Sequence, residues 1–160
     1  MLSRLDLQEV AKEVAKDPVR PHIPAEWRIM CGREVYSLYE DQYAQYAPPL
    51  EEEKRAVICV GYTNEVPITE EELDAFSKEA WKEGQDFGNT AVFYTVWSYS
   101  KGAGREIIIE AAKHIKETKG CTRFVTLSPL TQMAERFHLR NGAILLNKGN
   151  ECQNFEYENV

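Results

Sequence analysis

The sequence has no excess of basic residues: its 160 residues contain 19 Lys and Arg against 26 Asp and Glu, a formal net charge of −7. Binding to nucleic acid or to an anionic lipid surface depends on clustered Lys and Arg, and the chain has neither a basic stripe nor a basic tail. It also has no apolar run long enough to span a membrane, and acidic residues spread through its N-terminal segment argue against a secretory signal. We therefore expect a cytoplasmic protein that binds neither nucleic acid nor membranes.

Cysteine is sparse as well. The four cysteines, Cys31, Cys59, Cys121 and Cys152, stand far apart, and no CxxC or Cys/His pair has the spacing of a zinc site. Most of them lie in apolar or extended stretches, where a free thiol behaves as a small hydrophobic group. The sequence predicts no metal site and fits a reducing compartment.

The remaining composition is that of an ordinary globular protein, with 43% hydrophobic and 11% aromatic residues. A chain of this length can bury a core of its own, so one domain covering residues 1–160 is expected.

Helical periodicity dominates the N-terminal part of the chain. Ser3 with Asp6 three residues later predicts the start of a helix that Asp17 and Pro18 end. A second helix is predicted for residues 33–47, with a stripe of tyrosines on one face. That stripe either lines a substrate pocket or packs in the core, and it could also pair two copies of the chain.

Strands and helices alternate after residue 55. The stretch 90–99 is apolar on both faces, which predicts a central strand of an α/β sheet covered on both sides. The other predicted elements are strand 55–62, a helix after the capping box of Thr69 and Glu72, helix 105–119, strand 122–127, helix 129–141 with Ser128 as N-cap and Pro129 as first residue, and strands 143–147 and 153–158.

A glycine loop, Lys101-Gly102-Ala103-Gly104-Arg105, joins the central strand to its helix. Glycines allow a tight turn, the first amides of a helix lack intrahelical acceptors, and Lys101 and Arg105 add positive charge, so the loop could bind phosphate. The alternative is a simple strand-to-helix turn. The third glycine of the dinucleotide fingerprint and the GK[ST] ending of a P-loop are both absent.

The order of long strand, GxG loop, helix, strand, short helix and strand resembles the coenzyme A site of the GNAT acetyltransferase superfamily. Ala134, Phe137, His138 and Gly142 have the spacing of its A-x-x-L-Y-x-x-x-G helix, with His138 at the place of a tyrosine acid. The resemblance implies a GNAT-like acyl-CoA N-acyltransferase fold: an α/β domain with a mixed, mostly antiparallel sheet, helices on both faces and strands parted to admit pantetheine. It also implies a variable helical part at residues 1–55 and a core with the CoA site at 56–160.

Several stretches are similar to the malonyl-CoA decarboxylase branch of this fold, namely TNEVP, TAVFY, TLSPL, RFHLRNGA (residues 136–143) and NFEY. The long helical insertion between the LSP and FHL motifs of that family is missing here, as is its helical oligomerisation domain. Trp97 stands where the family has its catalytic serine. Ser98 could replace that serine if a β-bulge shifts the register of the strand.

The resemblance implies a CoA thioester, malonyl-CoA or acetyl-CoA, as the small-molecule partner, and it requires no metal. His138 and Ser98 are the expected catalytic residues. The expected coenzyme-binding residues are Trp97, Tyr99, Lys101, Gly102, Ala103, Gly104 and Arg105.

The reaction is left open between three possibilities. Decarboxylation of malonyl-CoA needs hydrogen-bond donors for the thioester oxygen and a proton donor or relay, which His138 could be. Acetyl transfer to an amine acceptor could use the same residues, and Trp97 in place of the serine favours a non-catalytic acyl-CoA-binding module. His138 could also be a structural core residue, and we expect His22 and His114 to face solvent.

Overall fold

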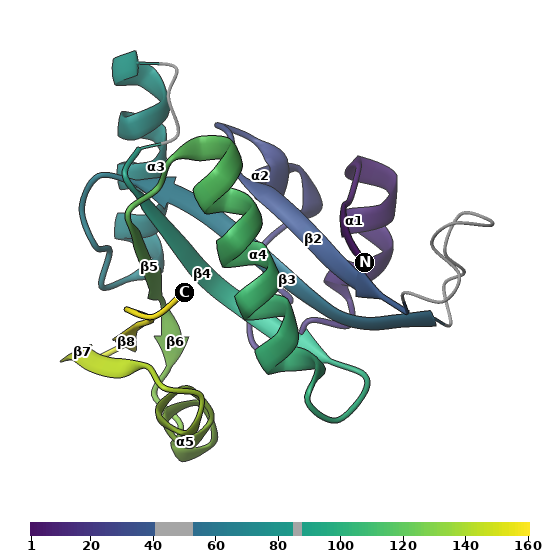
Figure 1. The fold of residues 1–160 in the computed structure, drawn as a ribbon. Helices are drawn as coiled ribbons and strands as arrows, with labels where there is room; N and C mark the ends of the chain where they lie inside the picture. Colours follow the sequence, from purple (N-terminus) through teal and green to yellow (C-terminus); the bar gives the residue numbers. More distant parts are fainter. Residues whose placement is uncertain (41–52, 85–87) are drawn as a thin grey trace.

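The computed structural model describes residues 1–40, 53–84 and 88–160, which form one sheet with helices packed against it (Figure 1). The strands are β1 (Leu2–Arg4), β2 (Glu34–Tyr39), β3 (Lys54–Thr63), β4 (Thr90–Ser98), β5 (Arg123–Thr126), β6 (Ser128–Pro129), β7 (Ile144–Lys148) and β8 (Cys152–Glu156). The helices are α1 (Leu7–Val14), α2 (Ala25–Ile29), α3 (Glu70–Gly84), α4 (Ala103–Lys119) and α5 (Gln132–Arg140).

The strands follow the order β1-β2-β3-β4-β5-β8-β6, and β7 pairs with β8. β4 and β5 are parallel, and the other described pairs are antiparallel. The predicted mixed, mostly antiparallel sheet is therefore confirmed, with the long apolar strand at its centre.

Each face of the sheet buries its own apolar cluster. On one face Ile107 of α4 packs with Ile58 and Phe93 of the central strands, and Figure 1 shows α4 crossing in front of these strands. On the other face Val10 of α1 and Leu73 of α3 belong to a second cluster. We call these the α4 face and the α1–α3 face. The predicted cover of helices on both sides of the central strand is confirmed.

The predicted helix at residues 33–47 is wrong where the structure describes it, because Glu34–Tyr39 is strand β2. It pairs with β1 and β3, and its side chains alternate, with Tyr36 on the α4 face and Val35 on the α1–α3 face. Large β-formers buried on both sides of a strand produced a stripe that also matched helical spacing. The rest of the predicted helix, with Tyr43 and Tyr46, lies outside the described residues.

Two predicted helix starts are also wrong. Ser3 lies in β1, and α1 is capped by Asp6, whose carboxylate accepts a hydrogen bond of 2.9 Å from the amide of Glu9. Ser128–Pro129 forms β6 against β8, and α5 is capped by Thr131 instead. In both places the residue predicted as the N-cap is paired in a strand, and the helix begins after the next side chain that can cap it.

β4 contains a β-bulge. Cys59 of β3 pairs with Thr95 and Val60 pairs with Phe93, so Tyr94 is the extra residue. Tyr94 belongs to the cluster on the α1–α3 face, and the Thr95 hydroxyl donates to Asp17 of the same side. Two successive side chains thus point the same way, and the alternation resumes beyond them.

β4 also extends beyond its parallel partner. The pairing with β5 ends where Phe93 meets Thr126, with one further bond from the amide of Leu127 to the carbonyl of Phe93. β4 continues to Ser98, while the chain on the other side passes into β6 and pairs with β8. Figure 1 shows β4 and β6 diverging from this point. The predicted parting of strands beside the central strand is therefore present.

A buried ion pair fixes the connector between α1 and α2 to the bulge. Asp17 and Arg28 are 2% and 1% exposed, and their side chains form a hydrogen bond of 2.8 Å. Asp17 also accepts from Thr95 and from two amides of the connector, while Arg28 donates to the carbonyls of Arg20 and Ile23. These bonds to the charged form hold the pKa of Asp17 below its usual range, although burial alone would raise it.

Replacing Arg28 with Leu should lower the free energy of unfolding by about 3–5 kcal/mol, because the Asp17 carboxylate would remain buried without its cation. The matched control is Lys78→Ala, which removes an exposed ion pair with Asp74 and should change stability by about 0.5 kcal/mol or less. Urea denaturation measures both. Equal, small losses would show that the buried pair does not fasten the connector.

Candidate functional site

The start of α4 has the properties of an anion site. Gly102, the N-cap, has a φ of 81°, which lies in the left-handed region and favours glycine, and no side chain caps the helix. The amide of Ala103 donates to the carbonyl of Ser100, whereas the amides of Gly104 and Arg105 lie in the helical turn whose donors have no intrahelical acceptor. The free amides and the helix dipole together favour a negatively charged group.

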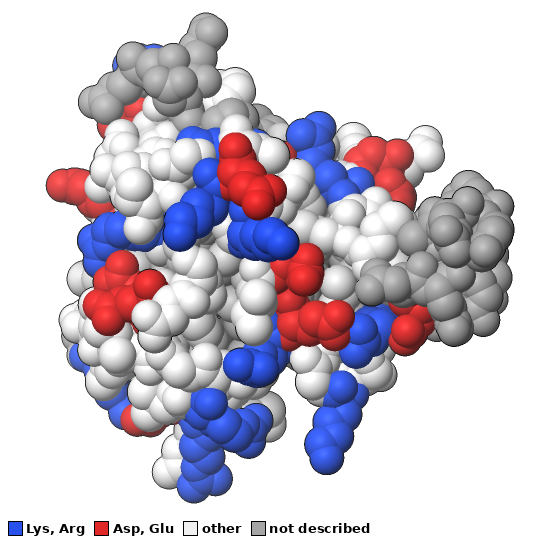
Figure 2. Space-filling view, viewed as in Figure 1, with Lys and Arg blue, Asp and Glu red and all other residues white. Residues whose placement is uncertain are grey.

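The loop before α4 is held in place by β3. Arg55 donates from Nη1 to the Glu106 carboxylate at 2.7 Å, and its carbonyl accepts from the amide of Tyr99. Lys101 and Arg105 are exposed next to this anchor. On the surface that carries α4, basic and acidic side chains are interspersed, and basic groups lie at the lower edge of the view over α5 and over the loop before α4 (Figure 2). The positive charge beside the start of α4 is therefore local.

Helix α5 forms the other side of this site. A Cβ atom added to Gly104 would lie 3.1 Å from Cζ of Phe137 and 3.9 Å from Cβ of Ser98. The absence of a side chain at Gly104 therefore lets α4 and the aromatic ring of α5 approach closely. The structure thus brings together Ser98, Gly104 and Phe137, all on the α4 face.

His138 lies directly behind Phe137 and is buried, with 7% of its surface exposed. Its Nδ1 shares a hydrogen bond of 2.7 Å with the hydroxyl of Tyr157, and its ring packs against Phe155 at 5.1 Å between centroids. Burial lowers the pKa of His138 to about 4, so the imidazole is neutral at physiological pH. Burial also raises the pKa of Tyr157, which keeps its hydroxyl protonated.

This environment narrows what His138 can do chemically. An imidazolium that acts as a stored acid would be costly at this position, whereas a neutral imidazole can accept a proton at one nitrogen and release one from the other. No hydrogen bond links Ser98 to His138 within the described residues. Tyr157 is the partner that sequence reasoning missed, although the NFEY stretch that contains it carried part of the resemblance.

The side chains of Trp97 and Tyr99 lie on the opposite face. Trp97 is buried in the cluster of the α1–α3 face, and its Nε1 donates to the Tyr99 hydroxyl, which donates to Glu13 of α1, each at 2.9 Å. The structure therefore separates these two predicted coenzyme-binding side chains from the loop at 101–105. Ser98, not Trp97, faces α4.

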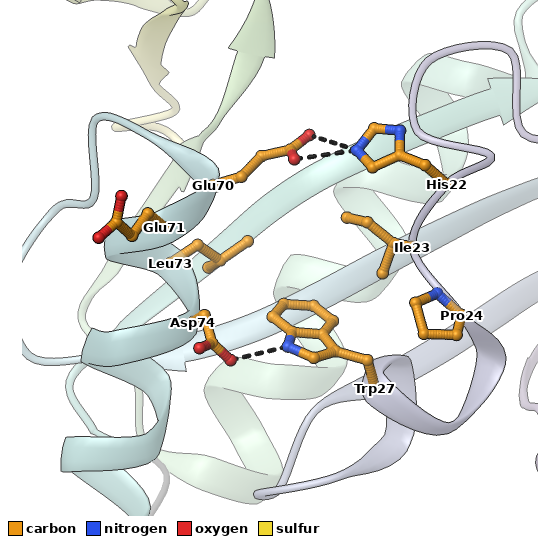
Figure 3. Close-up of a pocket in the computed structure, with 8 residues that line it drawn as sticks. All are labelled: His22, Ile23, Pro24, Trp27, Glu70, Glu71, Leu73 and Asp74. Carbon is orange, nitrogen blue, oxygen red and sulfur yellow. Dashed lines mark hydrogen bonds and ion pairs between the residues drawn. The ribbon is translucent and has the colours of Figure 1, made fainter.

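His22 and His114 are both exposed, as predicted. His22 borders a cavity of about 240 Å³ between the connector and the start of α3. Figure 3 shows His22 facing Glu70 at one end of this cavity and Trp27 facing Asp74 at the other, while Glu71 points away. The cavity lies on the α1–α3 face, behind the diverging strands. Its lining was not predicted, because its residues form no recognisable spacing pattern.

No protein-family model and no curated protein sequence matches the chain. Solved structures do match. The malonyl-CoA decarboxylase of Agrobacterium vitis superposes with a TM-score of 0.62 at 18% identity, over 86% of this chain but only 35% of the decarboxylase. A putative GNAT-family acetyltransferase of Desulfovibrio desulfuricans superposes with a TM-score of 0.59 at 15% identity, over 99% of this chain and 98% of the other.

The chain has the GNAT fold. An acetyltransferase of Bacillus subtilis, solved in complex with CoA, also shares this fold, with a TM-score of 0.57 at 10% identity over 97% of this chain and 93% of the other. The sequence resemblance to GNAT proteins and to malonyl-CoA decarboxylase is thereby confirmed at the level of fold. The chain spans about a third of the length of the decarboxylase that it matches.

The described residues contain neither a membrane-spanning helix nor a metal-binding cluster. None of their helices is both long and apolar enough to cross a membrane. Their His, Cys, Asp and Glu side chains form no group of three or more that could hold a metal ion.

Because the pKa of His138 is lowered, the free energy of unfolding should depend on pH. The unfolded chain binds a proton at this imidazole near pH 6.5, but the folded chain does so only near pH 4, so between these values the unfolded state holds more protons. Stability from this residue is therefore present above pH 6.5 and is lost as the pH falls to 4, by about 3 kcal/mol in total.

The measurement is urea unfolding of the wild type and His138→Gln across this range. The acid-induced loss should be steeper in the wild type, because the carboxylates contribute equally to both proteins and only the wild type carries the buried imidazole. Parallel stability curves would show that His138 is not buried as a neutral base.

Proposed function

We propose that this chain binds a CoA thioester on the α4 face and acts on its acyl group. The observation that carries the proposal is the uncapped start of α4, which follows the strand that diverges from its parallel partner after Phe93. Free amides at this end of a helix suit a pyrophosphate, and diverging strands leave backbone groups that can bond an extended pantetheine chain.

The residues at this place fit the ligand in charge and in shape. The amides of Gly104 and Arg105 would bind pyrophosphate oxygens, and Lys101 and Arg105 would add charge-assisted bonds. Gly102 supplies the left-handed turn that directs the helix toward the ligand. Trp97 and Tyr99 would take part only through their backbones, since their side chains lie on the other face.

The leading reaction is the decarboxylation of malonyl-CoA to acetyl-CoA and carbon dioxide. The bond between the α-carbon and the carboxylate breaks, its electron pair passes to the thioester oxygen, and a proton from solvent then adds to the α-carbon. Hydrogen-bond donors must stabilise the charge on the oxygen, and the backbone amides of β4 just beyond Phe93 are the candidates. Ser98 lies at the pyrophosphate end of the proposed site, where its Cβ is 3.9 Å from a Cβ placed on Gly104. His138 and Tyr157 can relay the proton without either holding a charge.

Acetyl transfer from acetyl-CoA to an amine is the second candidate. It is supported by the match to a putative acetyltransferase over nearly the full length of both chains, and by the short connection between β6 and α5 in place of the insertion of decarboxylases. A non-catalytic module that only binds acyl-CoA is the third, since Trp97 occupies the serine position and packs as a core residue.

Charge reversal at the loop should test ligand binding. The double substitution Lys101→Glu and Arg105→Glu should weaken CoA binding by a factor of about 10 or more, because each residue would lose a charge-assisted hydrogen bond. Lys113→Glu reverses one charge farther along α4 and should leave the dissociation constant unaltered. Isothermal titration calorimetry measures the dissociation constant of CoA for the wild type and both variants. An unaltered affinity in the double variant would place the pyrophosphate elsewhere.

The relay should be tested by turnover. His138→Gln should lower the rate of carbon dioxide release from malonyl-CoA by a factor of about 100 or more, and Tyr157→Phe should also lower it because the ring stays while the hydroxyl is lost. Lys113→Glu serves again as the control. Release of free thiol from acetyl-CoA only when an amine is present would favour transfer, and binding with no turnover of either thioester would favour the module.

A further inference from the structure

Arg20 occupies an unusual place between the diverging strands. It is 3% exposed, and its guanidinium donates from Nη1 to the carbonyl of Tyr94 in β4 and from Nη2 toward Sγ of Cys152 in β8, at 3.8 Å. These two strands lie on opposite sides of the divergence, since β4 loses its pairing with β5 after Phe93, while β8 pairs with β5 and β6 on the other side. A permanent positive charge therefore bridges the two strands on the α1–α3 face.

The partners of Arg20 leave part of its hydrogen-bonding capacity unused. A guanidinium has five N–H donors, and one of the acceptors here is a thiol, which accepts weakly. Burial raises the pKa of that thiol, so Cys152 stays neutral. Glu70 accepts from Nε at 2.8 Å, but its side chain is 39% exposed and also bonds His22 at 2.9 Å. On the side of β8, the guanidinium has no anionic partner among the described residues.

Arg20 lies near the place where the acyl group of the proposed ligand would be. Arg20 donates to the carbonyl of Tyr94, one residue beyond the last β4 and β5 pair. A pantetheine chain that ran from the start of α4 between the diverging strands would present its acyl group near this residue. Resting on that proposed function, we infer that Arg20 selects CoA thioesters whose acyl group ends in a carboxylate, such as malonyl-CoA.

An acyl carboxylate can form paired hydrogen bonds with the planar fork of an Arg side chain, whereas an acetyl group offers nothing to it. The ion pair is made to the bound substrate and not to the carbon dioxide that leaves. Arg20 therefore contributes to affinity and choice of substrate more than to the rate of bond breaking.

The test compares the wild-type affinities for malonyl-CoA, acetoacetyl-CoA and acetyl-CoA by calorimetry. Acetoacetyl-CoA has nearly the shape of malonyl-CoA but carries a methyl group in place of the charged oxygen. Malonyl-CoA should bind tighter than both by a factor of about 10 or more. Equal affinity for the three would overturn the role of Arg20 while leaving the CoA site standing, and binding of none would overturn both.

Three variants test the role of Arg20, and they should change the affinity for malonyl-CoA in opposite directions. Arg20→Gln should remove the preference for malonyl-CoA and leave acetyl-CoA binding unchanged, and Arg20→Lys should keep part of the preference because it keeps the charge without the fork. Glu70→Gln removes the competing carboxylate and should strengthen malonyl-CoA binding by about two- to fivefold. A weaker affinity for malonyl-CoA in Glu70→Gln would contradict the inference even if the Arg20 variants fail to fold.

Discussion

The buried ion pair between Asp17 and Arg28 is the interaction on which the arrangement of the N-terminal part depends. Asp17 accepts from Thr95, which follows the bulge of β4, and Arg28 donates to the carbonyl of Arg20. Neither charge could stay buried without the other, and each is also bonded to backbone groups. The connector is thereby held against β4 where that strand is irregular, and the path of the connector in turn places Arg20 and the cavity beside α3.

The bulge and the end of the β4 and β5 pairing occur at neighbouring residues, and each has a separate effect. The extra residue, Tyr94, changes which later side chains face each side of the sheet, so that Ser98 points to α4 and Trp97 to α1. The loss of pairing after Phe93 frees backbone groups along one edge of the strand. The bulge thus brings Ser98 to the start of α4, and the loss of pairing frees backbone donors farther back along β4. These two places are the two ends of the proposed CoA site.

Much of the fold could be predicted from the sequence. The central strand, the glycine loop and the helices around it follow from periodicity and capping, because apolar spacing and glycine positions act locally. β2 could not be separated from a helix, since Tyr36 and Tyr39 match a helical stripe as well as a two-sided strand. The caps of α1 and α5 could not be predicted, because the residues just before them pair in the short strands β1 and β6. That pairing is determined by β2 and β8, which are distant in sequence.

The candidate site also has one part that local sequence patterns predict and another that depends on residues distant in sequence. Its α4 face would bind the part of the ligand that all CoA thioesters share, and it would do so with glycines and free amides that have a recognisable spacing. His138 could be found through its motif, but its neutrality depends on Tyr157 and Phe155 from the last strand and its flank. The α1–α3 face would read the acyl group with long side chains such as Arg20, brought in by a connector with no motif. The proposed binding of the shared CoA moiety could therefore be predicted from the sequence. The proposed selection of the acyl group could not, because it depends on where the fold places the buried charges of the connector.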